Sequence, residues 1–306
     1  MLKVYRMTVA MATSISLFCM LSVAVAAETT ATAKILEVAE NVYRFDGENG
    51  YYSMFVVTDE GVIVIEPINP EHAKGLMAAI KSVTDKPVRY LLHSHNHWDH
   101  AKGGAVFSEK GVKILAHIEA YEWMKANPHP DMLLPNEFWT GKRKDIVLGG
   151  KKIELHHVGI SHGLGMTVFI LPEEKMAYIA DIVTPNRVLF ATVPDFNIKE
   201  LVRALKHVES LDFKTAIYSH SASKQPLGSK QDVTLTREYI ADLQAAIIGE
   251  FQKGTGFLDI PTEVKLPKYE HWAMYDQWLS LNVWRIMLDM HMGPFPWHPE
   301  HAYETK

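Results

Sequence analysis

Four histidines and an aspartate lie within the eight residues His93–His100, in the run His-Ser-His-Asn-His-Trp-Asp-His. Imidazole nitrogens and carboxylate oxygens are donors that divalent metal ions bind in proteins. In an extended segment His95 and His97 fall on the same side, so both can bind one ion. Asp99 and His100 then turn towards a second ion. A solvated histidine-rich tract is the alternative, but such tracts are usually of low complexity, whereas this run follows an apolar strand pattern. The sequence therefore predicts a metal site.

The elements that must position this run alternate between strands and helices. A strand pattern at 87–92 leads directly into it, after a hairpin at 54–66 and a helix pattern at 70–83. The second half repeats this order. Its strand patterns lie at 166–171, 176–180 and 214–218, and an amphipathic helix pattern lies at about 198–210.

The two halves also end alike, because the strand at 214–218 is followed by Ser219-His220, which matches Ser94-His95. Strand ends that are distant in the sequence are therefore expected to meet at one cleft. Strands that alternate with helices, and apolar strand runs without interruption, predict an α/β fold with sheets covered by helices. We expect four layers, in the order helix-sheet-sheet-helix.

Three further segments lie outside this repeated order. The segment 116–145 contains Trp123, Phe138, Trp139 and several prolines, which predicts a partly ordered insertion. It can wall a substrate pocket, or Trp139 can simply pack on the sheet. A long helix is predicted at 233–253. Apolar residues at helical spacing follow in 268–293, and they predict a helix docked on the body, with a dimer contact or a pocket lid as alternatives.

The N-terminal segment has the layout of a secretory signal peptide. Lys3 and Arg6 precede an apolar stretch, and small residues lie at Ala24, Ala26 and Ala27. We expect removal of residues 1–27 and a periplasmic or secreted protein. The single cysteine, Cys19, would leave with the peptide, so the mature protein should have no disulfide.

The remaining chain of about 280 residues is long enough for one large domain. We expect this domain at 28–255 and an aromatic-rich extension packed on it at 256–306. The 31 basic and 36 acidic residues of the full chain give a net charge of −5, and loss of Lys3 and Arg6 changes it to −7. This charge disfavours a nucleic-acid partner. No later apolar run is long enough to span a bilayer. A small-molecule substrate is expected, and the sequence does not define the oligomeric state.

The residues His95-Asn96-His97-Trp98-Asp99-His100 match the His-x-His-x-Asp-His signature of the metallo-β-lactamase superfamily, which the chain resembles from about Val38 to Lys253. The resemblance implies an αββα sandwich with two metal ions at one edge. It also implies three further ligands: His162 in a glycine-bearing turn, Asp181 as a bridging carboxylate after a strand, and His220 after another strand. His156 and His157 are competitors of His162. Glu66 stands where many members have an aspartate that supports the cleft.

The ligand set implied by the resemblance divides between two sites that share Asp181 and a water-derived hydroxide. His95, His97 and His162 bind one ion, and Asp99, His100 and His220 bind the other. Donors without thiolate suit zinc, with manganese or iron as alternatives. Asp99 would orient the nucleophile and accept its proton.

The expected reaction class is hydrolysis. An aspartate at the bridging position is similar to the glyoxalase-II-like and lactonase-like pattern, which favours an ester, lactone or thioester substrate. A β-lactamase is the main alternative. An iron-dependent sulfur dioxygenase and a non-catalytic zinc-binding protein are two others.

Overall fold

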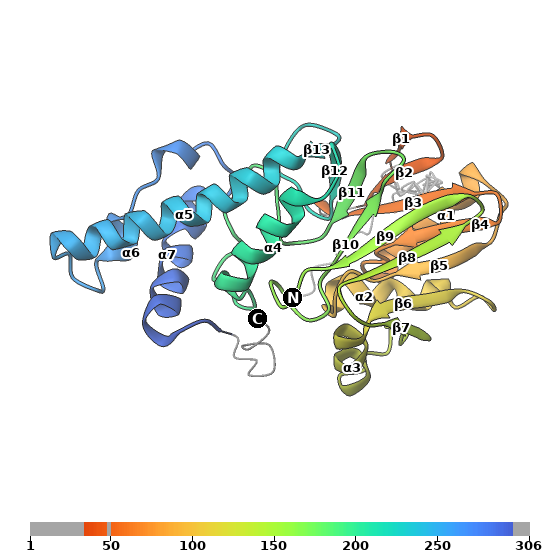
Figure 1. Ribbon diagram of the computed structural model, residues 1–306, viewed down its shortest axis with the longest axis horizontal. Helices are drawn as coiled ribbons and strands as arrows, with labels where there is room; N and C mark the ends of the chain where they lie inside the picture. The colour runs from red at the N-terminus through yellow and green to blue at the C-terminus, as the bar shows by residue number, and fades with distance from the viewer. Residues whose placement is uncertain (1–33, 48–49, 296–306) are drawn as a thin grey trace, which may run out of the picture. The chain divides into compact units, whose positions relative to one another are not determined.

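Two β-sheets form the centre of the protein (Figure 1). The computed structural model describes residues 34–47 and 50–295, which belong to one compact unit. The first sheet has the order β1-β2-β3-β4-β5-β6-β7. Its strands are β1 (Lys34–Ala39), β2 (Val42–Asp46), β3 (Tyr52–Thr58), β4 (Gly61–Ile65), β5 (Val88–Leu92), β6 (Lys113–His117) and β7 (Glu137–Trp139). Strands β1 to β4 pair antiparallel and β4 to β7 pair parallel.

The second sheet contains the later strands, in the order β13-β12-β11-β10-β9-β8. They are β8 (Arg143–Leu148), β9 (Lys151–His157), β10 (Thr167–Leu171), β11 (Met176–Ile179), β12 (Thr215–Tyr218) and β13 (Gly228–Ser229). Only the β11–β12 pair is parallel in this described sheet. Parallel pairing requires a crossover, and α4 (Ile198–Ser210) lies in the connection between these two strands.

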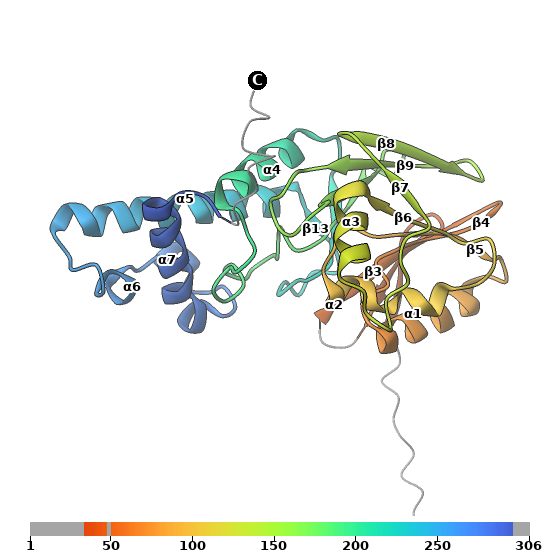
Figure 2. The same cartoon turned by 90° about the horizontal axis from the view of Figure 1, so that it is seen from below.

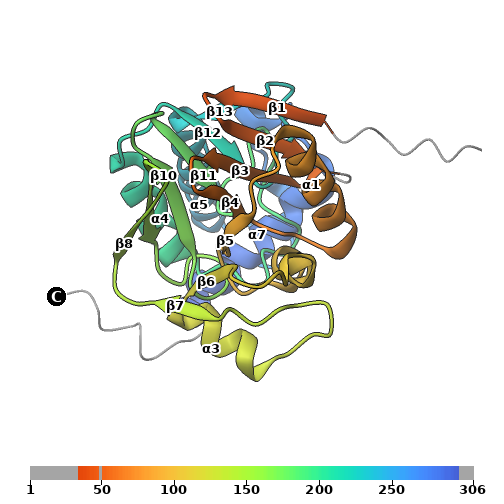
Figure 3. The ribbon, with the colours of Figure 1, turned by 90° about the vertical axis from the view of Figure 1, so that its right-hand side faces the viewer.

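Helices cover the outer face of each sheet. Side chains of α1 (Pro70–Val83), including Leu76 and Ile80, pack on the first sheet. Side chains of α4 and α5 (Lys230–Lys253), including Leu205 and Leu243, pack on the second. A separate apolar cluster, which includes Phe169, fills the space between the sheets. Figures 2 and 3 show α1 and α4 on opposite sides of the two sheets. The predicted four-layer α/β fold is confirmed.

Local capping explains where these helices begin. The Asn69 side chain accepts a hydrogen bond from the His72 amide, and Pro70 occupies the first turn of α1. Asn197 caps α4 in the same way. Both helices therefore have the predicted bounds. Helix α5 begins at Lys230, three residues before the predicted start, because Ser229 forms a capping box there.

The predicted insertion is more ordered than its prolines suggest. It contains α3 (Ile118–Ala126), β7 and the start of β8. Trp139 is buried in the cluster between the sheets, so it packs there and does not wall a pocket. Trp98 is 41% exposed, and its ring contacts Trp123 and His129. The short elements α2 (Trp98–Ala101) and η2 (Lys102–Phe107) follow the histidine run.

The C-terminal segment docks on the second sheet's side of the protein. It contains α6 (Ile260–Glu263), η3 (Pro267–Tyr269) and α7 (Tyr275–Met292). Most of the predicted stripe on α7 is buried against α5 and the loop after β11, whereas Met290 is exposed. The predicted signal peptide lies outside the described residues, and the boundary at 255 stays a prediction. Within the described residues, no helix has the length and apolar character needed to cross a membrane.

Candidate metal centre

The predicted ligands lie where strands of both sheets end. The run 93–100 follows β5, Asp181 follows β11, His220 follows β12, and His162 lies between β9 and β10. Ile179 of β11 is in register with Tyr218 of β12, so the segments that follow these strands leave the same sheet edge. Isolated bridges, Tyr51 to His220 and His162 to Phe196, tie the loops together.

The carboxylate of Asp181 lies at the centre of the predicted ligands. Its Oδ2 atom is 2.9 Å from His162 Nε2, 3.1 Å from His100 Nε2 and 3.4 Å from His95 Nε2. The other oxygen, Oδ1, is 3.3 Å from His220 Nε2. It also accepts a hydrogen bond from the Ser219 hydroxyl. One carboxylate thus contacts histidines of both predicted sites, as a bridging ligand must.

The ligand atoms gather in two overlapping groups, each with all its atoms within 4.8 Å of one another. The first contains His95, His97, His162 and Asp181, and the second contains His100, Asp181 and His220. Within the described part of the chain, the buried Nε2 atoms of His95 and His100 form no hydrogen bond. Buried polar atoms normally have a partner, so these nitrogens, together with the nitrogen and oxygen donor set, fit bound metal.

Asp99 lies beside these groups and belongs to neither of them among the described residues. Its Oδ2 atom is 3.7 Å from His100 Nε2 and accepts a hydrogen bond of 2.9 Å from the Tyr51 hydroxyl. The Asp99 side chain is 54% exposed. Its predicted role as a metal ligand therefore stays a prediction, and Tyr51 is its observed partner.

Neighbouring groups orient the histidine rings. Glu66 Oε2 is 2.5 Å from His100 Nδ1, and Glu66 Oε1 accepts a hydrogen bond from the Ser94 amide. The Ser94 hydroxyl is 2.7 Å from His95 Nδ1, and the Gly50 carbonyl is 3.2 Å from His220 Nδ1. These contacts fix the rings with Nε2 towards Asp181, which is how supporting hydrogen bonds prepare a histidine to bind metal.

Asp195 was not predicted from the sequence, yet it contacts two of the predicted ligands. Its Oδ2 atom is 2.7 Å from His97 Nε2, and Oδ1 is 3.6 Å from His162 Nδ1. Because Asp195 occupies Nε2 of His97, Nδ1 is the nitrogen that remains for a metal ion. No spacing in the sequence marks this residue, since the loop after β11 brings it to the site.

The charges of the cluster are strongly coupled. Burial alone would raise the pKa of Asp181, but His100, His162 and His95 hold it well below its usual value. Burial lowers the pKa of His95 to about 3, and the charge of His97 contributes to this shift. Burial acts in the same direction on His100, yet Asp181 and Glu66 raise its pKa well above the ordinary value. Neutral imidazole and ionised carboxylate are the forms that bind metal, and His95 and Asp181 are held in them.

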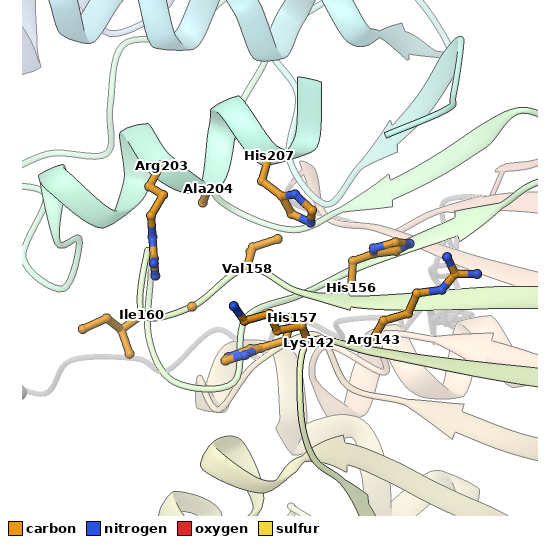
Figure 4. A pocket seen from close by; sticks show the side chains of 10 residues that line it. Lys142, Arg143, His156, His157, Val158, Ile160, Arg203, Ala204 and His207 are labelled. Atoms are coloured by element: carbon orange, nitrogen blue, oxygen red, sulfur yellow. The ribbon is translucent and has the colours of Figure 1, made fainter. Parts of the chain in front are cut away.

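The competing histidines lie elsewhere. His156 lines a separate pocket of about 470 Å³ between β9 and α4, which Figure 4 shows with Arg203 and His207 projecting from the helix. His157 stacks on His117 with ring centroids 3.8 Å apart and contacts Glu119. His117, Glu119 and His157 therefore form a separate group that could hold an ion by distance. Neither competitor reaches Asp181.

The comparisons with known proteins agree with this geometry. Residues 46–220 match the model of the metallo-beta-lactamase superfamily. The match covers more than half of the chain, which therefore belongs to the metallo-β-lactamase superfamily.

Three similar proteins illustrate this relationship. The chain is 28% identical over 172 residues to the 2,4-dinitroanisole O-demethylase subunit alpha of Nocardioides sp. (strain JS1661). This alignment covers 56% of the chain and 52% of the demethylase subunit. The chain therefore spans about half the length of this relative. A sec-alkylsulfatase from Pseudomonas sp. superposes with a TM-score of 0.71 and 17% identity, over 88% of this chain and 52% of that one. A metallo-beta-lactamase from Pontibacter korlensis superposes with a TM-score of 0.58 and 19% identity, over 68% of this chain and 99% of that one. At these identities the structural likeness shows the fold alone.

Proposed function

We propose that this protein is a metal-dependent hydrolase with two divalent ions per chain, which acts on the carbonyl of an ester, lactone or thioester. The observation that carries the proposal is the position of Asp181, whose two oxygens contact histidines of both ligand groups. A bridging carboxylate holds two ions close together, as a shared hydroxide requires. The absence of cysteine after residue 27 leaves only nitrogen and oxygen donors, which suit zinc, manganese or iron.

The residues of the centre have different roles in this proposal. His95, His97 and His162 would hold one ion and His100, His220 and Asp99 the other, with Asp181 between them. Metal held by these residues would lower the pKa of a bound water towards ~7 and stabilise the charge that develops on the substrate oxygen. Asp99 would orient the nucleophile and accept its proton, and the Tyr51 hydroxyl fixes the direction of the Asp99 carboxylate. The buried Glu66 holds His100 in place throughout.

The names of the similar proteins do not single out one substrate. A demethylase subunit is similar in sequence, and a sulfatase and a metallo-beta-lactamase share the fold. Asp181 favours an ester-type substrate over a β-lactam, because β-lactam-hydrolysing members commonly have cysteine or serine where this chain has the bridging aspartate.

The first test is metal content together with turnover. We expect about two transition-metal ions per chain by elemental analysis, and His95→Ala and His220→Ala should each lose part of this content while the fold persists. Lactone, aryl ester and thioester substrates should give a higher kcat/KM than a chromogenic cephalosporin.

Each contrary outcome identifies an alternative. A cephalosporin that leads by an order of magnitude, about 1.4 kcal/mol of transition-state stabilisation, would favour the β-lactamase. One tightly bound iron with oxygen uptake on a persulfide would indicate the dioxygenase. Two bound ions without turnover of any substrate would indicate a non-catalytic metal-binding protein.

A further inference from the structure

Arg187 is a cation beside the metal centre that the proposed reaction does not use. It lies six residues after Asp181, and its Nε atom is buried without a hydrogen-bond partner among residues 34–47 and 50–295. Its Nη2 atom donates to the Thr184 hydroxyl at 3.0 Å, and the guanidinium lies 5.5 Å from the Trp278 ring. Within the same described residues it forms no ion pair. A guanidinium has five donors, so most of them have no hydrogen-bond partner among the described residues.

The guanidinium is held close to the predicted ligands. Arg187 and Asp181 line one small cavity of about 10 Å³, which shows their proximity and not the size of a substrate pocket. Burial lowers the pKa of His220, and the charge of Arg187 adds to this effect. Burial also raises the pKa of the Tyr51 hydroxyl, and the charge of Arg187 acts against that rise. Arg187 is therefore within electrostatic range of the His220 and Tyr51 side of the centre.

The burial of Arg187 indicates what it binds. Burial lowers the pKa of its guanidinium, although the charge of Asp181 acts against this fall. A cation, partly desolvated at this place, costs free energy unless an anion approaches it. No carboxylate of the described residues forms an ion pair with Arg187, because the nearby Asp99 and Asp181 contact Tyr51 and the histidines. A neutral ester would leave this cost without compensation.

We propose that Arg187 binds an anionic group of the substrate, so that the natural substrate is an ester-type molecule with a negative charge in addition to the reacting carbonyl. This inference rests on the proposed function of the same site. The planar guanidinium suits a carboxylate or a similar oxyanion, to which it can donate two parallel hydrogen bonds. Trp278, which α7 contributes, and Thr184 orient the guanidinium for this contact.

The test compares two esters that share their leaving group and differ in one terminal group. Mono-(4-nitrophenyl) glutarate ends in a carboxylate, and 4-nitrophenyl pentanoate ends in a methyl group. We expect the metal-loaded protein to prefer the glutarate ester by kcat/KM. In Arg187→Gln the ratio of the two values should fall by about tenfold or more, as expected for loss of a hydrogen bond between charged groups. Arg187→Lys should give an intermediate ratio, and Arg203→Gln, an exposed arginine on α4, is the matched control.

A binding measurement separates this proposal from the proposed function. Titration calorimetry of the metal-loaded protein should show tighter binding of glutarate than of pentanoate, because one carboxylate of each can reach the metal centre and only glutarate has a second. Arg187→Gln should remove this difference. If esters are not hydrolysed but the difference persists, the hydrolase is wrong and the anion site stands. If the parent protein shows no preference for the anionic member of either pair, Arg187 is not an anion site, whether or not the variants fold.

Discussion

At the scale of single residues, Asp195 shows how one carboxylate can prepare two ligands. It contacts His97 Nε2 at 2.7 Å and lies 3.6 Å from His162 Nδ1. Burial would raise its pKa, but the charges of His162 and His97 lower it to about 2, so the carboxylate is ionised at neutral pH. A negative charge on the far side of an imidazole orients the ring and increases its basicity towards a metal ion.

We therefore expect Asp195→Asn to weaken metal binding. The amide keeps the size of the side chain but removes the charge, and loss of such a supporting group typically costs about 10–100-fold in affinity. Competition with a chromophoric chelator measures the affinity. Asp212→Asn, which removes an exposed carboxylate paired with Lys175, is the control. An Asp195→Asn protein with the affinity of the parent would show that Asp195 only occupies the space beside His97.

The sequence predicted this site unevenly, for a physical reason. His95, His97 and His100 could be predicted because ligands that share one short segment must show their spacing. Asp181 and His220 lie close together because β11 and β12 pair in parallel, which strand patterns could indicate. Asp195 and Arg187 have no such pattern, since only the tertiary path of their loop brings them to the centre.

At the scale of elements, the loop between β11 and α4 depends on α7. Four of its residues other than glycine have positive φ: Asp181, Asn186, Ala191 and Val193. This conformation is costly for a β-branched residue such as Val193. Asn282 of α7 donates to the Leu189 and Ala191 carbonyls and accepts from the Tyr239 hydroxyl, and Arg285 donates to the Val193 and Phe196 carbonyls. The C-terminal helix thus stabilises the loop that carries Arg187 and Asp195.

Asn282→Ala should consequently affect both stability and metal binding. It leaves two carbonyls and one hydroxyl without their partner in a buried place, which costs about 2–4 kcal/mol in the free energy of unfolding. It should also lower the metal affinity, because Asp195 loses its fixed position. Urea unfolding and chelator competition measure the two effects, with Leu288→Ala at an exposed position of α7 as the control. Normal metal affinity in a destabilised Asn282→Ala protein would mean that α7 supports the fold and not the centre.

Helices were predicted best where a side-chain cap marks the residue at which the helix begins. Helices α1 and α4 have side-chain caps at Asn69 and Asn197 and match their predicted bounds. Strands β1 and β2 were not predicted individually, and the order within 116–145 was missed. In that segment β6 and β7 pair in parallel and bury Trp139, a tertiary contact that overrides the prolines.

At the scale of the whole molecule, buried histidines outside the metal ligands make folding sensitive to pH. His72 is almost fully buried on α1, where its Nε2 atom lies 2.7 Å from the Ser53 hydroxyl. Burial lowers its pKa to about 4, helped by the charge of His100. In the unfolded chain the same imidazole protonates near its ordinary pKa of about 6.5. The unfolded state therefore binds more protons between these two values, and stability must fall as the pH drops through that window.

The metal-free protein, held in a chelator, should accordingly lose stability between pH 7 and pH 5, and His72 alone should account for about 2 kcal/mol of the loss. His93 and His95, whose pKa values burial lowers to about 4 and about 3, act in the same direction. His100 and His162, whose pKa values neighbouring carboxylates raise, act in the opposite direction. The depressed pKa values of Asp181 and Glu66 matter only at lower pH, because unfolded carboxyl groups are still ionised at pH 5. His72→Gln should therefore show a smaller difference in unfolding free energy between the two pH values than the parent protein, whereas His271→Gln, at an exposed position, should not. Equal differences in all three proteins, measured by urea unfolding, would mean that His72 does not remain neutral in the folded state.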